Sequence, residues 1–404
     1  MIKWKFIKLR DTGTIITGNT PPTANREYYG NDYAFIKPTD IVEGVRHVEN
    51  TEERFSIKGY ERYRKSLLPV NTPCVVTIGS LGKKLCLTKE PSFTNQAINA
   101  IIMNKGNDGR FIYYMMKIML PTVKHLSSGT ASGRENVSKS SFGNIKINVP
   151  PLPVQQKIAN ILSVYDDLIE NNNHRIELLE HAAQQIFKEW FVRFRFPGYE
   201  NAHFTKGMPD VWEVKRLQEF GLIETGKTPP TVESDNYSGN IMFIKTPDMH
   251  GQAFVIDTDE KLTQKGHFTQ PKKMLPANSI CVSCIGTGGV VAINAEPAHT
   301  NQQINSIIPY DSNYLEWLYF TCKALKSTIE MFGATGATMT NLSKGKFEGL
   351  KVIFPGETLV YRFSKITAPM INKIKVLQLQ NQNLTKQRDL LLQRLMSGKL
   401  EVLQ

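Results

Sequence analysis

The septet TGNTPPT at residues 17–23 recurs as TGKTPPT at residues 225–231. Two adjacent prolines exclude an ordinary helix or a central strand, so the septet predicts a rigid turn. The repetition extends much further, in the same order and at nearly constant spacing. Matching pairs are FIKPTDI (35–41) with FIKTPDM (243–249), LPVNTPCVVTIG (68–79) with LPANSICVSCIG (275–286), NQAINAI (95–101) with NQQINSI (301–307), and NVSKSSF (136–142) with NLSKGKF (341–347).

The composition of the whole chain is that of an ordinary globular protein. The 404 residues are 41% hydrophobic and 21% charged, which leaves room for more than one core. Neither a membrane span nor a signal peptide is indicated, so we expect a cytoplasmic protein. Five cysteines, an odd number in a large chain, favour reduced thiols. The net charge of +12 points to an acidic partner, with nucleic acid first and solubility alone as the alternative.

The two halves share a second pattern, a strand-rich part followed by a long helix. Short apolar runs such as CVVTI and KINV, separated by Gly, Pro, Asn and Asp, predict strands and loops. FIYYMMKIML (111–120) and YLEWLYFTCKAL (314–325) are the helices expected there. From Pro153, and again near the end of the chain, apolar residues recur at steps of three and four, which predicts long helices.

The helical stripes have the spacing of a coiled coil with polar interruptions at Asn172, Asn381 and Arg388. An amphipathic helix that packs only on its own globule is the alternative. Pro369 is expected to end a short helix near Thr367 or to kink the long one. The predicted interface residues are Ile161, Leu168, Asn172, Ile176, Leu179, Ile186 and Trp190 in the first helix, and Ile374, Leu377, Asn381, Leu384, Leu391 and Leu395 in the second.

These elements predict an α+β fold with an internal pseudo-twofold repeat. Two similar strand-rich globular domains, at residues 1–150 and 199–354, alternate with long helices at 151–198 and 355–404. At about 1.5 Å per residue, a helix from 154 to 192 is about 60 Å long and acts as a spacer. We expect the two helices to pair antiparallel, with the globules at opposite ends.

The chain resembles the specificity subunit of type I restriction-modification systems. PPLPVQQKIANILSVYDDLIENNNHRIELLEHAAQQIFKEWFVRFRFPG (150–198) is similar to the central conserved region of that family, and QNLTKQRDLLLQRLMSGKL (382–400) to its distal one. The septets and the NQAINAI and NQQINSI segments are similar to recurring features of its target-recognition domains. The second helix opens with PGETLVYRFSK (355–365), which departs from PPLPVQQKIAN in the first, so the resemblance assigns its start less securely.

The resemblance implies a non-catalytic subunit that binds double-stranded DNA. Each target-recognition domain would read one half of a split, asymmetric sequence, while the helices set the spacing and dock two modification subunits. Those subunits are adenine methyltransferases that use S-adenosylmethionine, and restriction subunits that use ATP and magnesium are an optional addition. For this chain itself we expect no cofactor, no metal and no membrane.

Two alternative functions remain: an NTPase or nuclease that acts on DNA, and a coiled-coil scaffold that binds no DNA. GLIETGKT (221–228) matches the phosphate-binding loop pattern, but PPTVESDNYSGN follows Thr228 where that loop must open a helix. The aligned GTIITGNT (13–20) has Asn19 in place of Lys227. PDVWEVK (209–215) imitates a PD-(D/E)-x-K nuclease signature. Asp210 and Glu213 would point to opposite faces of an extended strand, so they could not share one magnesium ion. The two cysteines of CVSC (281–284) supply only two of the four ligands that a zinc site needs, so they are better interpreted as core residues of a strand.

Candidate DNA-contacting residues lie in loops at matching positions of the two copies. The first pair comes from the FIK segments, the second group follows the GSLG turn, and the third lies in the polar segments 127–141 and 333–346. Gln96 and Gln302 either lie on the recognition face or are buried, with their side-chain amides hydrogen-bonded to the backbone. The predicted residues are Lys37 and Lys245, Lys83 and Lys84, and Arg134, Lys139, Lys344 and Lys346.

Overall fold

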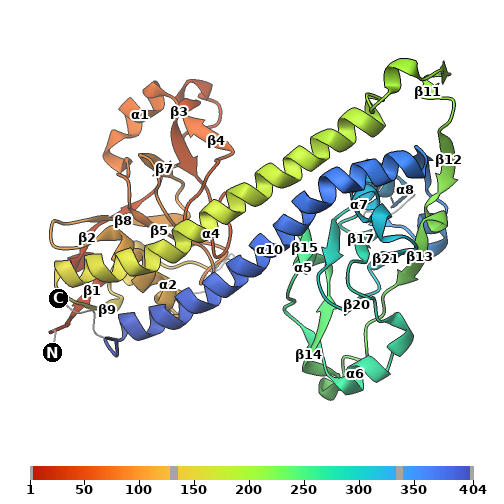
Figure 1. The fold of residues 1–404 in the computed structure, drawn as a ribbon. Helices are drawn as coiled ribbons and strands as arrows, with labels where there is room; N and C mark the ends of the chain where they lie inside the picture. The colour runs from red at the N-terminus through yellow and green to blue at the C-terminus, as the bar shows by residue number, and fades with distance from the viewer. Residues whose placement is uncertain (1–2, 128–134, 334–339, 401–404) are drawn as a thin grey trace. The chain divides into compact units, whose positions relative to one another are not determined.

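The computed structural model describes residues 3–127, 135–333 and 340–400, and these form two compact units (Figure 1). The first unit comprises residues 1–170 and 383–404, and the second comprises residues 171–382. Each unit contains one strand-rich domain and a stretch of each long helix. Within the described part of the chain, no helix combines the length and the apolar character that crossing a membrane requires.

The strand-rich domain of the first unit contains a four-stranded sheet in the order β2-β8-β5-β6, a three-stranded sheet in the order β4-β3-β7, and the antiparallel pair β1-β9. In the three-stranded sheet, β3 runs parallel to β7 and antiparallel to β4. The strands are β1 Lys5–Lys8, β2 Gly13–Thr17, β3 Tyr29–Ile36, β4 Glu53–Phe55, β5 Pro73–Val76, β6 Leu85–Leu87, β7 Ser92–Thr94, β8 Ile98–Met103 and β9 Lys146–Val149; the helices are α1 Ile57–Tyr63, α2 Gly109–His125 and α3 Lys139–Gly143.

The domain of the second unit repeats this topology, with one additional strand, β15, at the edge of the larger sheet. Its sheets run β13-β21-β17-β19-β15 and β16-β14-β20, and β12 pairs with β23 as β1 pairs with β9. The strand β14 is again parallel to β20 and antiparallel to β16. The strands are β12 Glu213–Arg216, β13 Gly221–Thr225, β14 Tyr237–Ile244, β15 Phe254–Val255, β16 Lys261–Leu262, β17 Ile280–Ser283, β19 Val291–Asn294, β20 Ala298–Thr300, β21 Ile304–Pro309 and β23 Lys351–Phe354.

Short elements complete the second unit. They are the helices α5 Thr246–Met249, α6 Gln264–Phe268, α7 Leu315–Ala324, α8 Lys326–Gly333 and α9 Lys344–Glu348, and the short strands β10 Phe204–Thr205, β11 Met208–Pro209, β18 Ile285–Gly286 and β22 Thr340–Asn341. The helices expected at 111–120 and 314–325 are confirmed as α2 and α7. The core role expected for Cys281 and Cys284 is confirmed, because both thiols are free and buried beside or within β17.

The two long helices are α4, Leu152–Phe187, which ends in a π-helical turn at Lys188–Val192, and α10, Glu357–Met396. The prediction that a helix ends near Thr367 is wrong, because α10 runs through Pro369. In the first unit, residues of both helices share one apolar cluster, with Ile158 and Leu162 on α4 and Leu392 and Leu395 on α10. The N-terminal part of α4 thus packs with the C-terminal part of α10, as the predicted antiparallel pair requires.

In the second unit the same antiparallel pairing is seen. Asn172 Nδ2 donates to Asn381 Oδ1 at 2.9 Å, and further along α4 the centroid of the Phe187 ring lies 6.0 Å from that of Phe363. The residue numbers therefore rise on α4 as they fall on α10. Asn381 in turn donates to Asn173 at 2.7 Å. The polar interruptions at Asn172 and Asn381 therefore meet each other, which is the arrangement that selects register in coiled coils.

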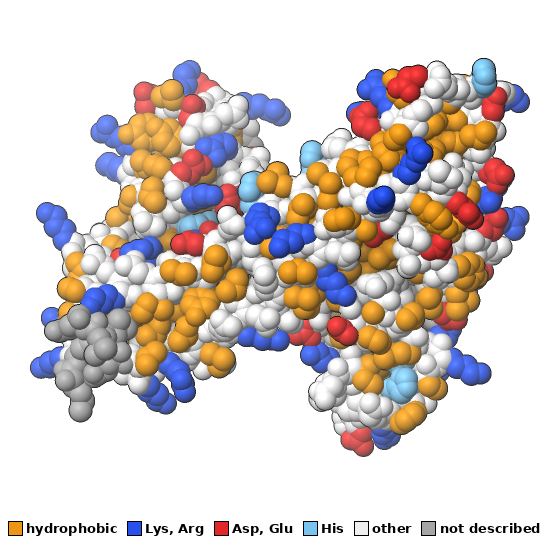
Figure 2. Space-filling model, in the orientation of Figure 1, with side chains coloured by type: hydrophobic (Ala, Val, Ile, Leu, Met, Phe, Trp, Pro, Cys, Tyr) orange, Lys and Arg blue, Asp and Glu red, His pale blue; other side chains and the backbone are white. Residues whose placement is uncertain are grey.

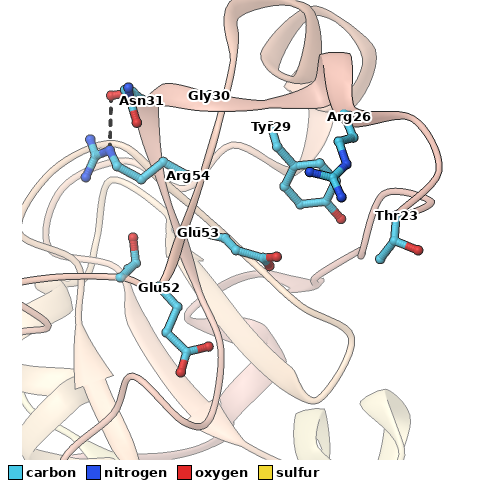
Figure 3. A pocket seen from close by; sticks show the side chains of 9 residues that line it. Thr23, Arg26, Tyr29, Gly30, Asn31, Glu52, Glu53 and Arg54 are labelled. Atoms are coloured by element: carbon cyan, nitrogen blue, oxygen red, sulfur yellow. Dashed lines mark hydrogen bonds between the residues drawn. The ribbon is translucent and has the colours of Figure 1, made fainter.

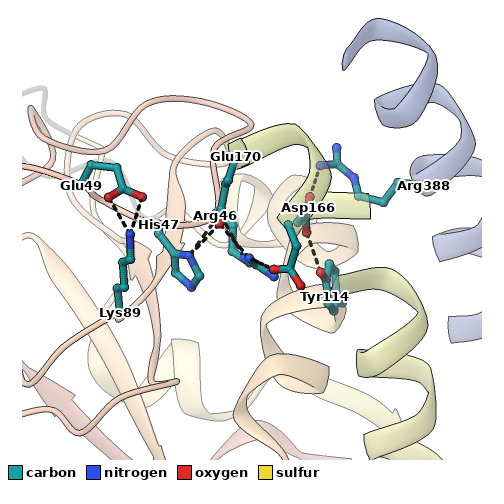
Figure 4. A network of polar contacts seen from close by, with 9 residues as sticks. Arg46, His47, Glu49, Lys89, Tyr114, Asp166, Glu170 and Arg388 are labelled. Atoms are coloured by element: carbon teal, nitrogen blue, oxygen red, sulfur yellow. Dashed lines mark hydrogen bonds and ion pairs between the residues drawn. The ribbon is translucent and has the colours of Figure 1, made fainter. Parts of the chain in front are cut away.

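A buried ionic contact joins the helices in the first unit (Figure 4). Arg388 on α10 lies 2.5 Å from Asp166 on α4, and both side chains are 3% exposed. Tyr114 on α2 donates its hydroxyl to the other carboxylate oxygen of Asp166 at 2.5 Å. The domain, α4 and α10 thus meet at a single carboxylate.

A second set of contacts fastens the loop after β3 to α4 in the first unit (Figure 4). Arg46 donates to Asp167 at 2.5 Å and to Glu170 at 2.8 Å, and His47 lies 3.1 Å from Glu170. Burial raises the pKa of Glu170, but hydrogen bonds from His47 and Arg46 outweigh it and bring this pKa to about 2. Glu170 is therefore ionised at neutral pH and holds the loop on the helix.

The predicted interface residues divide into three groups. Asn172, Ile374, Leu377 and Leu395 are buried. Partly buried residues packed on a core are Ile176, Leu179, Ile186, Trp190 and Leu391, and Asn381 and Leu384 are also half-buried. Ile161 and Leu168 are 37% and 48% exposed, so their predicted place between the two long helices is wrong.

The two errors have one physical cause. The buried face of α4 in the first unit contains Ile158, Leu162 and Asp166. Because an aspartate occupies an interior position, with Arg388 and Tyr114 as its partners, the pattern of apolar residues alone selects the wrong face.

We predict that Arg388→Met destabilises the first unit by about 3–5 kcal/mol, because Asp166 stays buried without its counter-charge. The double variant Asp166→Leu, Arg388→Met should recover most of this loss, because apolar side chains of similar volume fill the same space. Urea unfolding followed by circular dichroism measures both. A double variant as unstable as the single one would show that the ion pair is not the source of the effect.

Candidate nucleic-acid interface

Each septet is bound by its backbone to the segment that carries the NQ motif of the same unit. In the first unit, the amide of Gly18 donates to the carbonyl of Ile98 at 3.3 Å and that of Asn19 to Thr94 at 2.9 Å. In the second, Gly226 donates to Ile304 at 3.1 Å and Lys227 to Thr300 at 2.9 Å. The two motifs therefore recur together because they are in contact.

The glycine of the septet is required by this close approach. A Cβ atom on Gly18 would lie 2.0 Å from the carbonyl oxygen of Thr94, and one on Gly226 would lie 2.2 Å from that of Asn301. Real Cβ atoms do not come so close to a backbone oxygen. The septet could not lie against the NQ segment with any other residue at this position.

Side chains complete the attachment of the septet. Its first threonine donates to an asparagine, Thr17 to Asn99 and Thr225 to Asn305, both at 2.6 Å. Its second threonine donates to the glutamine of the NQ motif, at 2.5 Å in both units. The carbonyl of the first proline accepts from a tyrosine hydroxyl, Pro21 from Tyr29 at 2.8 Å and Pro229 from Tyr237 at 2.7 Å.

The glutamines themselves are exposed. Gln96 and Gln302 each accept from a threonine hydroxyl and present the rest of the amide to solvent. Of the two interpretations left open by the sequence, the buried amide bonded to the backbone is therefore wrong. Each septet leaves a strand at its first threonine and runs into a turn that begins at its last residue, Thr23 or Thr231.

A basic groove of about 660 Å³ lies beside the septet of the first unit. Arg62, Arg64 and Lys65, at the end of α1 and in the turn that follows it, face Lys139 at the start of α3. Among the described residues, none of these four side chains has an ion-pair partner. The groove is lined by Ile16, Thr17, Asn19, Glu61, Arg62, Tyr63, Arg64, Lys65, Ser66 and Lys139.

A second hollow in the first unit, of about 490 Å³, is less suited to an anion (Figure 3). It is lined by Thr23 at the end of the septet, by Arg26 and Arg54, and by Glu52 and Glu53. Two acidic side chains here offset the two arginines. Arg54 is also occupied, since it donates to the carbonyl of Asn31 at 3.1 Å and to Glu90 at 2.9 Å.

The second unit carries basic residues at several positions equivalent to those of the first groove. Lys272 corresponds to Lys65 in the turn after the short helix, and Lys344 starts α9 as Lys139 starts α3. Lys227, in the septet, is exposed. The second unit thus carries positive side chains in its septet and in segments that correspond to the groove of the first unit, and positive charge attracts a phosphate backbone.

The predicted DNA-contacting residues have different surroundings. Lys139 lines the groove, and Lys83 and Lys346 are exposed. Lys344 lies 3.7 Å from Glu348. Arg134 lies outside the described residues.

Three other predicted lysines have their charge or donor hydrogens occupied within the fold. Lys37 lies 2.7 Å from Glu52 and 3.3 Å from Glu53, and Lys245 lies 2.6 Å from Glu260. Lys84 donates to the carbonyl of Pro38 at 2.7 Å. These contacts favour a structural role for Lys37, Lys84 and Lys245 over one in binding phosphate.

Sequence reasoning missed Arg62, Arg64 and Lys65. The run ERYRK (61–65), just before the repeated LP dipeptide at 68–69, was the available signal. The sequence analysis rejects GLIETGKT (221–228), which contains Lys227, as a phosphate-binding loop because no helix is expected after Thr228. That expectation about the helix is confirmed. The septet leads to a short 3-10 helix at Ser234–Asn236, and no helix begins at Thr228 among the described elements.

A buried histidine pair supports the interface of the second unit. His299 on β20 precedes the NQ motif, and its Nε2 lies 3.0 Å from Nδ1 of His267 on α6. Gln270, just before Lys272, approaches the other nitrogen of His299 at 3.5 Å. Burial and the neighbouring His267 lower the pKa of His299 to about 4. The first repeat has Phe93 at the position of His299.

We predict that the second unit loses stability as the pH falls from about 6.5 to about 4. Over this window the unfolded chain binds a proton at His299 that the folded chain does not, which removes up to about 3 kcal/mol. His299→Phe should weaken this pH dependence. Melting temperatures at pH 7 and pH 5 test it, and equal losses in the variant and the parent would contradict the role of His299.

Known proteins can now be compared with this arrangement. The family model described as type I restriction modification DNA specificity domain matches residues 1–181 and 209–359. The HindI specificity subunit of Haemophilus influenzae is 32% identical over 325 residues, 65% of this chain and 71% of that protein. The MjaIX specificity subunit of Methanocaldococcus jannaschii is 28% identical over 410 residues, 99% of this chain and 94% of that protein.

A solved structure shares the fold. The S subunit of a type I restriction-modification system from M. genitalium superimposes with a TM-score of 0.60 at 18% identity, covering 100% of this chain and 97% of that one. Two matches to one family model, one per repeat, agree with the duplicated topology seen here. The chain therefore belongs to the type I restriction-modification specificity subunits, which are non-catalytic subunits that recognise DNA.

Proposed function

We propose that each unit reads one part of a split DNA target through the surface around its septet. The observation that carries this proposal is the repeated construction of that surface. Both septets are held by the same backbone and side-chain hydrogen bonds; a basic groove lies beside the first, and the second carries the exposed Lys227. The exposed residues nevertheless differ, since Arg62 and Arg64 of the first repeat correspond to Thr269 and Pro271 of the second. One scaffold with two sets of exposed side chains suits two different sequences.

The paired helices would set the number of base pairs between the two parts of the target. Two modification subunits would methylate adenine within it, with S-adenosylmethionine bound to those subunits. Restriction subunits, where present, would bring ATP and magnesium. In this division of labour the present chain supplies recognition alone.

An exposed apolar stripe on α4 supports docking of a modification subunit. Ile161, Val164 and Leu168 are 37%, 56% and 48% exposed, and their spacing of three and four residues places them on one face of the helix. On the surface drawn in Figure 2, hydrophobic side chains lie among lysines and arginines. Apolar side chains aligned on one helix face provide the kind of surface that a protein partner buries.

Exchange of residues 212–354 for the corresponding segment of another specificity subunit should change one part of the methylated sequence and leave the other unchanged. The reason is that each domain folds around its own core and carries its own septet surface. Mapping methylated adenines in cells that express the chimera with its modification subunits measures this. Loss of both parts of the motif in a folded chimera, or no change in either, would refute the proposal.

Leu168→Arg is expected to weaken binding of the modification subunit at least tenfold, because it places a charge in the apolar stripe. The melting temperature should stay the same, because the side chain is 48% exposed. Ile57→Arg is the matched control, since Ile57 is 58% exposed on α1. Co-purification of the modification subunit with each tagged variant distinguishes them. If Leu168→Arg retains the subunit as well as the control does, the stripe is not the docking surface.

A further inference from the structure

The third residue of the septet is the position at which the TGxTPPT motif differs between the repeats, Asn19 in the first and Lys227 in the second. The fold does not impose this difference. Both backbone amides make the same hydrogen bond, to Thr94 or to Thr300, at 2.9 Å. Both side chains are exposed. A residue that is held so firmly by its backbone and left free at its side chain is well placed to meet a ligand.

Neither side chain is engaged by any other part of the described structure. Across residues 3–127, 135–333 and 340–400, the amide group of Asn19 and the ammonium group of Lys227 have no hydrogen-bond or ion-pair partner. Lys37 and Lys245, which are also duplicated, differ in this respect because carboxylates hold them. Lys227 therefore keeps its full charge for an external partner.

The charge at this position compensates for a change elsewhere in the interface. Arg62 and Arg64 of the first repeat are replaced by Thr269 and Pro271 in the second. Of the two lysines that follow, Lys273 lies 2.7 Å from Glu224 and is neutralised. The second repeat thus loses positive charge in the turn after α6 and regains one unit at the septet.

We propose that the third septet residue contacts DNA in both units, with Lys227 on a backbone phosphate and Asn19 on a base edge. A lysine is a flexible point charge that suits phosphate without reading sequence, whereas an asparagine amide can donate and accept at once, as at adenine. Arg62, Arg64 and Lys65 supply the phosphate contacts beside Asn19, so an uncharged residue suffices there. This inference rests on the function proposed above.

The salt dependence of binding tests the role of Lys227. In the complete complex with modification subunits, on a duplex that carries the mapped target, Lys227→Asn should reduce the slope of log K against log salt by about 0.9. This variant has the residue of the first repeat, so the fold should accept it. Lys206→Asn is the matched control, because Lys206 is exposed in the turn between β10 and β11, and its slope should not change. Asn19→Lys should increase the slope by a similar amount.

The sequence of methylated sites tests the role of Asn19. Asn19→Ala should leave the slope unchanged and make one position of the first part of the target degenerate. If Lys227→Asn behaves as Lys206→Asn does, and Asn19→Ala leaves the motif intact, the inference is overturned. The outcome is separable from the proposed function, because the exchange of residues 212–354 would in that case still move half of the motif.

Discussion

Buried polar contacts decide which faces of the two long helices meet, and the rest of the structure depends on them. Asp166 and Arg388, each 3% exposed, lie 2.5 Å apart in the first unit, and Asn172 bonds Asn381 at 2.9 Å in the second. Leucine and isoleucine tolerate a shift of one helix along another. An ionised carboxylate does not, because a shift would leave it buried without its partner, at a cost of several kcal/mol.

The same contacts fasten the recognition domains to the helices. In the first unit, Tyr114 donates to Asp166, and Arg46 donates to Asp167 and Glu170, so the domain is tied to α4 at two places. In the second unit, Tyr319 on α7 donates to Glu180 on α4 at 2.7 Å, and Gln378 on α10 accepts from the amide of Phe254 at 3.1 Å. Each unit therefore holds its domain, and with it the septet surface, against the long helices through polar groups.

The sequence predicted the duplication, the long helices and their antiparallel pairing, because repeated segments and a helical period are local signals. It placed Ile161 and Leu168 at the helix interface wrongly, since the interior position belongs to Asp166, whose partner Arg388 is remote in sequence. Long-range partners also explain the candidate site. Lys37 and Lys245 pair with Glu52 and Glu260, which are distant in sequence, so the sequence does not show that their charge is neutralised. Arg62 and Arg64 lie beside the septet only in the folded chain, so the sequence does not mark them as candidates.

We propose that the two septet surfaces bind separate stretches of one duplex. Hydroxyl-radical footprinting of the complete complex on its methylation target can decide this, with the parent chain compared with the triple variant Arg62→Ala, Arg64→Ala, Lys65→Ala. Two protected stretches are expected for the parent, with selective loss of one for the variant. A single continuous footprint, or equal loss of protection along the whole site, would contradict it.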